Sequence, residues 1–507
     1  MVIQNKRTRL LITGVVMLAA IMQIVDTTIV VVAQPHMEGS LGANPDQISW
    51  VLTSYLISSG IFMPLTGFLT DRLGQRFYLL LSITGFVIAS MLCGMATSLD
   101  EIVLFRLIQG VAGAGLVPSA QSILVSIYPE EERGHAMAIF GVGAMVGPVL
   151  GPTLGGYLTQ VFNWRWVFFV NLPVGVLAFM GAWMFVPETD RHERRTDWIG
   201  FAFLALAVSC MQFVLDRGQQ DGWFNSHTIQ VAAILSILGY VCLIIRNMEM
   251  GAGAIFRLSV FRDRNFASSC LLLAVFMFSM YGALDLQPIM LESLLNYPTL
   301  TAGLALAPRG IAAMISMFLA GRLITRVGVR PLVIFGLTCV FFGTFATTWY
   351  TPQIPLWWVI WPILVQGFGL GMVFVPIATA AFATLPPSQS AEAAGVRQLA
   401  RTIGSSIGVA ISSAIMTREG QEAWNQMGGH LTPFSPAVTH FFHHMPVQAG
   451  TPLAGALLAH ILGPQTNWRG MLDAFYMMAM STLLGFPLVF LLGKHVGKTP
   501  KGRVATE

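Results

Sequence analysis

The amino-acid sequence predicts an all-α membrane protein made of two related six-helix bundles, with two further helices inserted between them. Three observations lead to this prediction. Hydrophobic residues make up 55% of the 507 residues and charged residues 10%, a composition outside the range of soluble globular proteins. Apolar segments long enough to cross a bilayer recur along most of the chain. A ten-residue cassette at residues 67–76 also returns, with changes, at residues 321–330.

Each apolar segment predicts one membrane-spanning helix, because a helix needs about 20 residues to cross the hydrocarbon core of a bilayer. On this criterion we expect about fourteen spans. They cover residues 10–34, 48–70, 77–96, 102–127, 136–160, 166–186, 198–215, 228–245, 266–290, 303–324, 332–349, 358–385, 398–416 and 473–493.

Basic residues orient these spans. Most of the 28 Lys and Arg residues fall in the two terminal segments and in the even-numbered turns, including Arg397 just before the thirteenth span. Cytoplasmic loops of membrane proteins carry such an excess of Lys and Arg. We therefore expect a multi-pass membrane protein with both termini in the cytoplasm. The net charge of +4 reports this topology and predicts no nucleic-acid partner.

Two interruptions divide the chain into domains. We expect a first six-helix bundle at 1–190, a charged connector with two inserted helices at 191–265, a second bundle at 266–493 and a cytoplasmic tail at 494–507. Within the second bundle, residues 417–472 are expected to form a long periplasmic loop. Its apolar middle, 451–462, is too short to cross a bilayer, so it is expected on the membrane surface or against a partner.

The two bundles share more than the cassette. Residues 34–35 (Gln-Pro) match residues 287–288, and residues 109–110 (Gln-Gly) match residues 366–367, in the same order and at similar spacing. Spans 1–6 therefore correspond to spans 9–14. Internal repeats of this kind are typical of transporters whose two halves rock around a central binding site.

Four motifs relate this chain to known transporters. They are the span 1 motif at 26–35, the cassette at 67–76, the span 4 motif at 106–115 and the span 5 Gly/Pro run at 143–156. On these motifs the chain resembles the fourteen-span drug:proton antiporter family of the major facilitator superfamily, the EmrB- and QacA-like multidrug efflux transporters, and is closer to the EmrB type. The resemblance implies the major facilitator fold, a place in the bacterial inner membrane and hydrophobic small-molecule substrates. It also implies a periplasmic membrane-fusion adaptor and an outer-membrane channel as partners.

Asp26 and Arg106 lie inside predicted spans, where an ionised group costs roughly 2.5–3.5 kcal/mol and therefore needs a reason. Apolar surroundings favour the neutral form of Asp26, whereas a nearby Arg106 favours the carboxylate. Such a group can bind and release a proton when its access to water changes. We therefore predict that Asp26, Arg106 and Gln109 couple transport to protons. The alternative is a static pair that holds spans 1 and 4 together.

Asp285, Arg309 and Gln366 are the candidates for a substrate cavity in the second half. Asp285 would attract cationic compounds or titrate, unless it simply faces water. Arg309 would attract anionic or weakly acidic compounds, or form a structural ion pair with Asp285. The 27 Met and 34 Phe residues suit an adaptable apolar cavity, although most of them are expected to face lipid or other helices.

The Gly/Pro run in span 5 predicts a flexible hinge. Glycines at every fourth position line one helix face and permit very close packing, and prolines favour a bend. We expect a seal between the two halves that opens and closes during transport, and simple helix packing is the alternative. The hinge residues are Gly143, Gly147, Pro148, Gly151, Pro152, Gly155 and Gly156.

The first cassette predicts a conformational latch at the cytoplasmic ends of spans 2 and 3. Asp71 would pair with a helix end or with basic residues of the other half, whereas its counterpart in the repeat is Thr325. A solvated loop charge is the alternative. The latch residues are Gly67, Asp71, Arg72, Gly74 and Arg76.

A proton-driven exporter explains the repeat, the intramembrane charges and the Gly/Pro run together, with the proton gradient in place of a cofactor. A proton-coupled transporter of one small metabolite is the alternative on the same scaffold. We expect no enzyme, because the sequence contains no nucleotide-binding loop or catalytic triad spacing. His440, His443 and His444 lack a nearby acidic or Cys ligand, so we expect no metal site.

Overall fold

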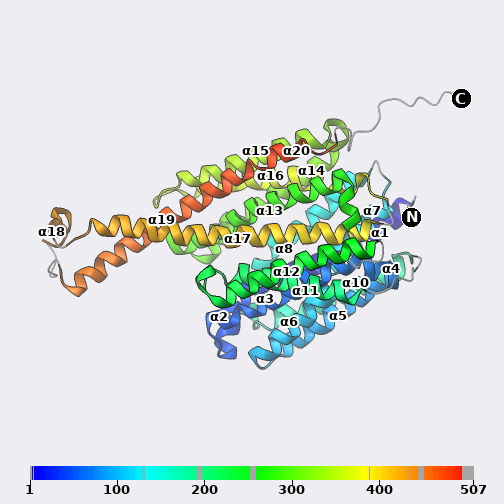
Figure 1. Cartoon of the computed structure of the whole chain (residues 1–507), viewed down its shortest axis with the longest axis horizontal. Coiled ribbons are helices and arrows are strands. Elements are labelled where there is room, and N and C mark those ends of the chain that lie inside the picture. Colours follow the sequence, from blue (N-terminus) through cyan, green and yellow to red (C-terminus); the bar gives the residue numbers. More distant parts are fainter. Residues whose placement is uncertain are drawn as a thin grey trace.

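A computed structural model describes residues 3, 5–129, 132–189, 191, 197–251, 258–386, 389–432, 434–443 and 450–493. Within these ranges the chain is built from helices and contains no strand (Figure 1). The predicted C-terminal tail, His444 and the middle of the charged connector lie outside them. Thirteen stretches of the described chain are long and apolar enough to span a membrane.

The predicted all-α architecture is confirmed, and each predicted span is occupied by helix. The first half contains α1 (Lys6–Leu41), α2 (Pro45–Ile48), α3 (Trp50–Phe62), α4 (Thr66–Leu73), α5 (Gln75–Met95), α6 (Leu99–Gly113), α7 (Leu116–Ile127), α8 (Arg133–Val161), α9 (Trp166–Phe169) and α10 (Asn171–Phe185). The inserted pair is α11 (Trp198–Arg217) and α12 (His227–Met250). The second half contains α13 (Arg264–Ile289), α14 (Thr299–Val327), α15 (Val329–Ala346), α16 (Leu356–Ala383), α17 (Ser390–Gly429), α18 (Pro436–Phe442), α19 (Pro452–Thr482) and α20 (Gly485–Val489).

The two halves share their backbone geometry at the cassettes. Gly74 and Gly328 occupy the eighth place of the two copies and adopt φ values of +87° and +90°. Residues with a Cβ atom rarely adopt this conformation. Gly74 separates α4 from α5, and Gly328 separates α14 from α15. Both turns therefore depend on glycine.

The last arginine of each cassette holds the final helix of its own half. The guanidinium of Arg76 lies over the ring of Trp183 in α10, 5.1 Å from the ring centre. Arg330 donates hydrogen bonds to the carbonyl oxygens of Phe490, at 2.8 Å, and of Leu492. Corresponding arginines of the repeat therefore each contact the last part of their own half, through different partners.

The predicted periplasmic loop at 417–472 is largely helical, so the prediction of a loop is wrong for most of this segment. Helix α17 continues to residue 429 and α19 starts at residue 452. At 1.5 Å per residue, the 40 residues of α17 extend about 60 Å, twice the thickness of a bilayer core. Figure 1 shows the two helices projecting together beyond the bundles, at the left. Apolar side chains of both helices, including Trp424 and Leu458, meet there around a hollow of about 310 Å³.

Candidate functional site

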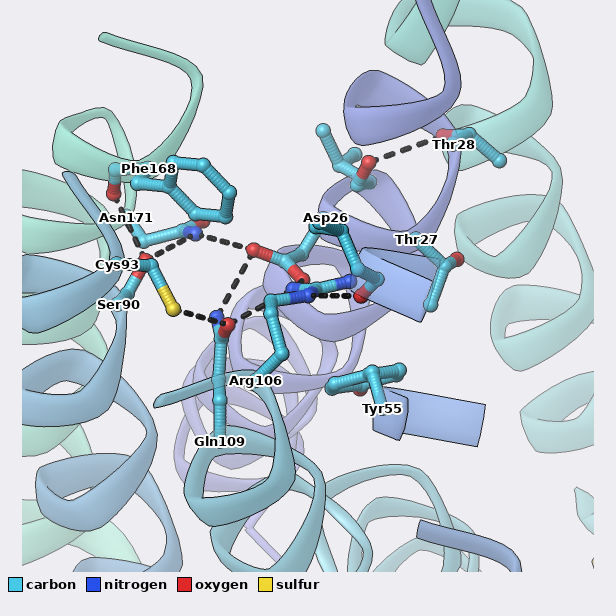
Figure 2. Close-up of polar contacts among 12 residues, drawn as sticks. Asp26, Thr27, Thr28, Tyr55, Ser90, Cys93, Arg106, Gln109, Phe168 and Asn171 are labelled. Atoms are coloured by element: carbon cyan, nitrogen blue, oxygen red, sulfur yellow. Dashed lines mark hydrogen bonds and ion pairs between the residues drawn. The ribbon is translucent and has the colours of Figure 1, made fainter. Parts of the chain in front are cut away.

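The charged centre of the first half is an ion pair between α1 and α6. The Nη1 atom of Arg106 lies 2.6 Å from the Oδ2 atom of Asp26, and both side chains are fully buried. Figure 2 shows them pointing toward each other between the helices. A buried pair of this kind is stable only when hydrogen bonds satisfy the remaining polar atoms.

Two amide side chains supply hydrogen bonds to Asp26. The Nε2 atom of Gln109 and the Nδ2 atom of Asn171 both donate to its Oδ1 atom, at 3.0 and 2.8 Å. Gln109 also accepts a 2.8 Å bond from Nη1 of Arg106, and Asn171 donates to the hydroxyl of Ser90 at 3.0 Å. Side chains from α6 and α10 therefore meet at the carboxyl group of α1, and Ser90 of α5 is joined to them through Asn171 (Figure 2).

The sequence identified Asp26, Arg106 and Gln109 but missed Asn171. Asn171 is 3% exposed and is the first residue of α10. A lone amide inside an apolar segment is the signal that points to it, because buried polar side chains need hydrogen-bond partners. Which partner it takes depends on how α10 packs against α1, and no local pattern in the sequence encodes that.

The remaining contacts of Arg106 leave polar atoms unused. Its Nε atom donates to the carbonyl of Val51 at 3.0 Å, and its guanidinium lies 4.4 Å from the centre of the Tyr55 ring. Its Nη2 atom and the Tyr55 hydroxyl are buried, and neither has a hydrogen-bond partner among the described residues. The cluster thus holds a carboxyl group beside spare hydrogen-bonding capacity, which suits exchange of a proton when water gains access.

The glycine face of α8 packs against α1 on both sides of Asp26. A methyl group at Gly147 would overlap Ile24, and one at Gly151 would overlap Thr28. The Thr28 hydroxyl donates a 3.0 Å hydrogen bond to the carbonyl of Gly147.

This partner differs from the prediction of a seal between the two halves. Gly143 and Gly155 also face α1 of the same half, whereas Gly156 has open space around it. Contacts between α8 and the second half include Gly141, which lies against Met317 of α14. The small-residue spacing indicates a close-packed face but not which neighbour it packs against. The side chains of Pro148 and Pro152 lie outside the described part.

The two cassettes make equivalent contacts across the halves. A methyl group at Gly67 of α4 would lie 2.6 Å from the Cα atom of Glu392 in α17. One at Gly321 of α14, the corresponding glycine, would lie 2.6 Å from the Cβ atom of Ala138 in α8. Because only glycine permits such close approach, the first place of each cassette is a contact between halves.

Further contacts gather at the same end of the molecule, where the chain begins (Figure 1). The hydroxyl groups of Ser122 in α7 and Ser390 in α17 are hydrogen bonded at 2.9 Å. Asp71 and Arg72 also lie at this end, half-buried and exposed respectively, and their role as a latch stays a prediction. The halves are therefore closed against each other here.

The second half has a polar cluster that contains Arg309 and Gln366 but not Asp285. The Oε1 atom of Gln366 accepts hydrogen bonds from Nη2 of Arg309 at 3.2 Å and from Nε2 of Gln287 at 3.1 Å. Arg309 occupies the position that Tyr55 holds in the first half. Gly367 packs on the backbone of Arg309, as Gly110 packs on the backbone of Tyr55.

The alternative of an ion pair between Arg309 and Asp285 is wrong. Asp285 is exposed, and the described residues show no ion pair for it, because its side chain leaves α13 on a different face from Gln287. Arg309 is 8% exposed, and its Nε atom has no hydrogen-bond partner in the described chain. The cluster therefore holds a positive charge that no carboxylate in the described part balances.

Comparison with known proteins finds relatives that match most of the chain. A sequence model described as "Major Facilitator Superfamily" matches residues 16–409. The chain is 31% identical to the "Multidrug export protein EmrB" of Haemophilus influenzae over 96% of both chains. It is 34% identical to the "Fatty acid resistance protein FarB" of Neisseria gonorrhoeae over 85% of both chains. Its fold is similar to that of the human organic anion transporter MFSD10, with a TM-score of 0.62 and 16% identity over 96% of this chain and 100% of the other.

Proposed function

The chain belongs to the major facilitator superfamily, and we propose that it is a proton-driven antiporter that exports hydrophobic drugs or toxic compounds across the bacterial inner membrane. It is a multi-pass membrane transporter and not an enzyme. The buried pair of Asp26 and Arg106 carries the proposal, because an intramembrane carboxyl group needs a functional reason.

Asp26 is proposed to exchange a proton for substrate. As a carboxylate it is held by Arg106, Gln109 and Asn171, all of which donate hydrogen bonds to it. Protonation removes the charge that attracts Arg106 and weakens the contact between α1 and α6. A change in protonation therefore alters how helices of the first half pack, which is the kind of two-state element that a transporter requires.

The closed end of the molecule supports alternating access. With both termini in the cytoplasm, the contacts of Gly67, Gly321 and the Ser122–Ser390 pair close the cytoplasmic side. The structure then represents a state in which substrate cannot enter from the cytoplasm. Opening these contacts while the opposite end closes would return the carrier to its loading state.

The relatives' names support a broad range of apolar substrates for this chain, since one is a multidrug export protein and another a fatty acid resistance protein. The uncompensated Arg309 favours compounds that carry a negative charge as well as an apolar body. Buried apolar surface supplies affinity for such molecules without demanding one shape.

The helical hairpin of α17 and α19 supports a periplasmic adaptor that leads to an outer-membrane channel. The hairpin projects beyond the bundles (Figure 1). Its apolar hollow is lined by residues of both helices. Phe434 near its tip is 91% exposed. An exposed apolar surface of this kind marks a contact site for another protein.

Inverted membrane vesicles test the proposed function directly. When the vesicle interior is made acidic, we expect a hydrophobic dye to accumulate inside. Protons that leave the vesicle drive the dye in, and entry into an inverted vesicle corresponds to export from the cell. A protonophore should abolish the accumulation. Gradient-driven movement of one metabolite with no dye transport would support the alternative of a specific metabolite transporter and contradict multidrug export.

Arg309→Ala is expected to reduce export of an anionic dye about tenfold and leave export of a neutral dye largely unchanged. The reason is the loss of a charged hydrogen-bond donor, whose removal costs about 1.5–3 kcal/mol. Asp285→Asn is the comparison, because it removes an exposed charge of the opposite sign from the same half. Equal losses for anionic and neutral dyes would assign Arg309 a structural role.

A further inference from the structure

Arg397 is a buried charged residue that belongs neither to the ion pair of the first half nor to the two cassettes. The sequence placed it in a cytoplasmic turn, but the structure places it inside α17 with 1% of its surface exposed. Its Nε and Nη2 atoms are buried and have no hydrogen-bond partner in the described residues. Its guanidinium lies 5.1 Å from the centre of the Phe374 ring in α16. A buried arginine normally pairs with an acid, so this one lacks its usual partner.

Its place in α17 puts it directly behind the closed contact between the halves. Ser390 in the first turn bonds to Ser122 of α7, and a methyl group at Gly395 would lie 2.8 Å from the carbonyl oxygen of Met63. Arg397 follows Gly395 by two residues. When these contacts separate, Arg397 is the first buried cation of α17 that a molecule entering from this end meets.

A second guanidinium lies one helical turn further along. Arg401 donates a 3.0 Å hydrogen bond from Nη2 to the hydroxyl of Tyr281, and no described carboxylate pairs with it. The first half balances Arg106 with Asp26, whereas Arg397 and Arg401 of α17 have no carboxylate beside them in the described chain. This part of the second half is therefore prepared to receive negative charge.

We propose that Arg397 is an anion-binding site on the cytoplasmic entry path, which takes the carboxylate of an amphipathic substrate when the contact between the halves opens. This inference rests on the proposed export function. A guanidinium binds a carboxylate through two parallel hydrogen bonds, and its Nε and Nη2 atoms are the two that lack partners. The Phe374 ring beside it offers an apolar surface for the hydrocarbon part of the same molecule. In the closed state the site is sealed from water.

The test measures binding of a fluorescent long-chain fatty acid and of its uncharged methyl ester. The full-length protein is placed in nanodiscs that contain only zwitterionic lipid. We expect the wild type to bind the acid more tightly than the ester, and Arg397→Gln to lose about tenfold or more of affinity for the acid alone. Arg397→Lys should fall between them, because lysine keeps the charge without the paired donors.

Arg418→Gln is the matched control, because Arg418 lies on the same helix with its side chain 78% exposed. Unfolding temperatures of all variants establish that they are folded. Equal acid affinity in wild type and Arg397→Gln would overturn the proposed site. If acidic phospholipid in the nanodiscs displaces the fatty acid from the wild type but not from Arg397→Gln, the site binds a lipid headgroup and the assignment to substrate is overturned.

The proposed function is judged separately by gradient-driven export of a neutral dye by the wild type. Neutral-dye export together with unchanged acid binding in Arg397→Gln would overturn only the anion site. Failure of the wild type to export the dye would overturn the exporter itself, whatever the binding measurements give.

Discussion

Asp26→Asn is expected to abolish proton-driven export, reducing gradient-dependent dye accumulation to the level of vesicles without the protein. The asparagine keeps the shape of the side chain and an oxygen that accepts from Gln109 and Asn171. It cannot bind and release a proton at any relevant pH, so the coupling step is lost. Accumulation in inverted vesicles with an acidic interior measures this directly.

Loss of transport must be separated from loss of the fold. Asp26→Asn leaves Arg106 buried without a negative partner, and breaking a buried pair in this way costs about 3–5 kcal/mol. Unfolding temperature and dye binding without a gradient show whether the variant retains its structure. Asp221→Asn removes an exposed carboxylate between α11 and α12 and should transport as the wild type does. Normal gradient-driven export by folded Asp26→Asn would reduce the ion pair to a structural clamp.

The architecture was predictable because the properties that determine it are local or repeated. Span length, charge asymmetry and the cassettes are each visible in a short window of sequence, and the matching φ angles of Gly74 and Gly328 follow from the same pattern. The identity of Asp26 and Arg106 was predictable for a similar reason, since a charge inside an apolar span stands out.

Contacts between distant helices were not predictable in the same way. Asn171 bonds to Asp26 because α10 lies beside α1. Arg397 lies inside α17 because this helix begins at Ser390, before the apolar stretch begins. The apolar stretch starts at residue 398, so the sequence predicted that the thirteenth span starts there. Neighbouring helices bury the turns of α17 that precede this stretch, including Arg397, and a single sequence does not show such contacts.

Gly151→Leu is expected to stop transport, because the glycine face of α8 is the surface on which α1 carries the proton site. A side chain at position 151 meets Thr28, two residues from Asp26, so α1 must shift or α8 must move away. Overpacking of this kind costs about 1–3 kcal/mol, which a stable bundle can tolerate while its moving parts cannot. Gly156→Leu is the matched control, since nothing lies within 4 Å of the position its Cβ atom would take.

A crosslink at the closed end distinguishes a hinge from ordinary packing. Ser122→Cys and Ser390→Cys, whose hydroxyl groups are 2.9 Å apart, should form a disulfide only while the halves are closed there. In a background without the five native cysteines, substrate and pH should change the crosslinking yield of the otherwise wild-type protein. If α8 must slide along α1 during the cycle, Gly151→Leu holds that yield constant under every condition. The opposite outcome is a crosslinking yield of Gly151→Leu that responds to substrate and pH as the wild-type yield does, with only a lower unfolding temperature. That result would show that the glycines serve packing alone and that the two halves move without a hinge in α8.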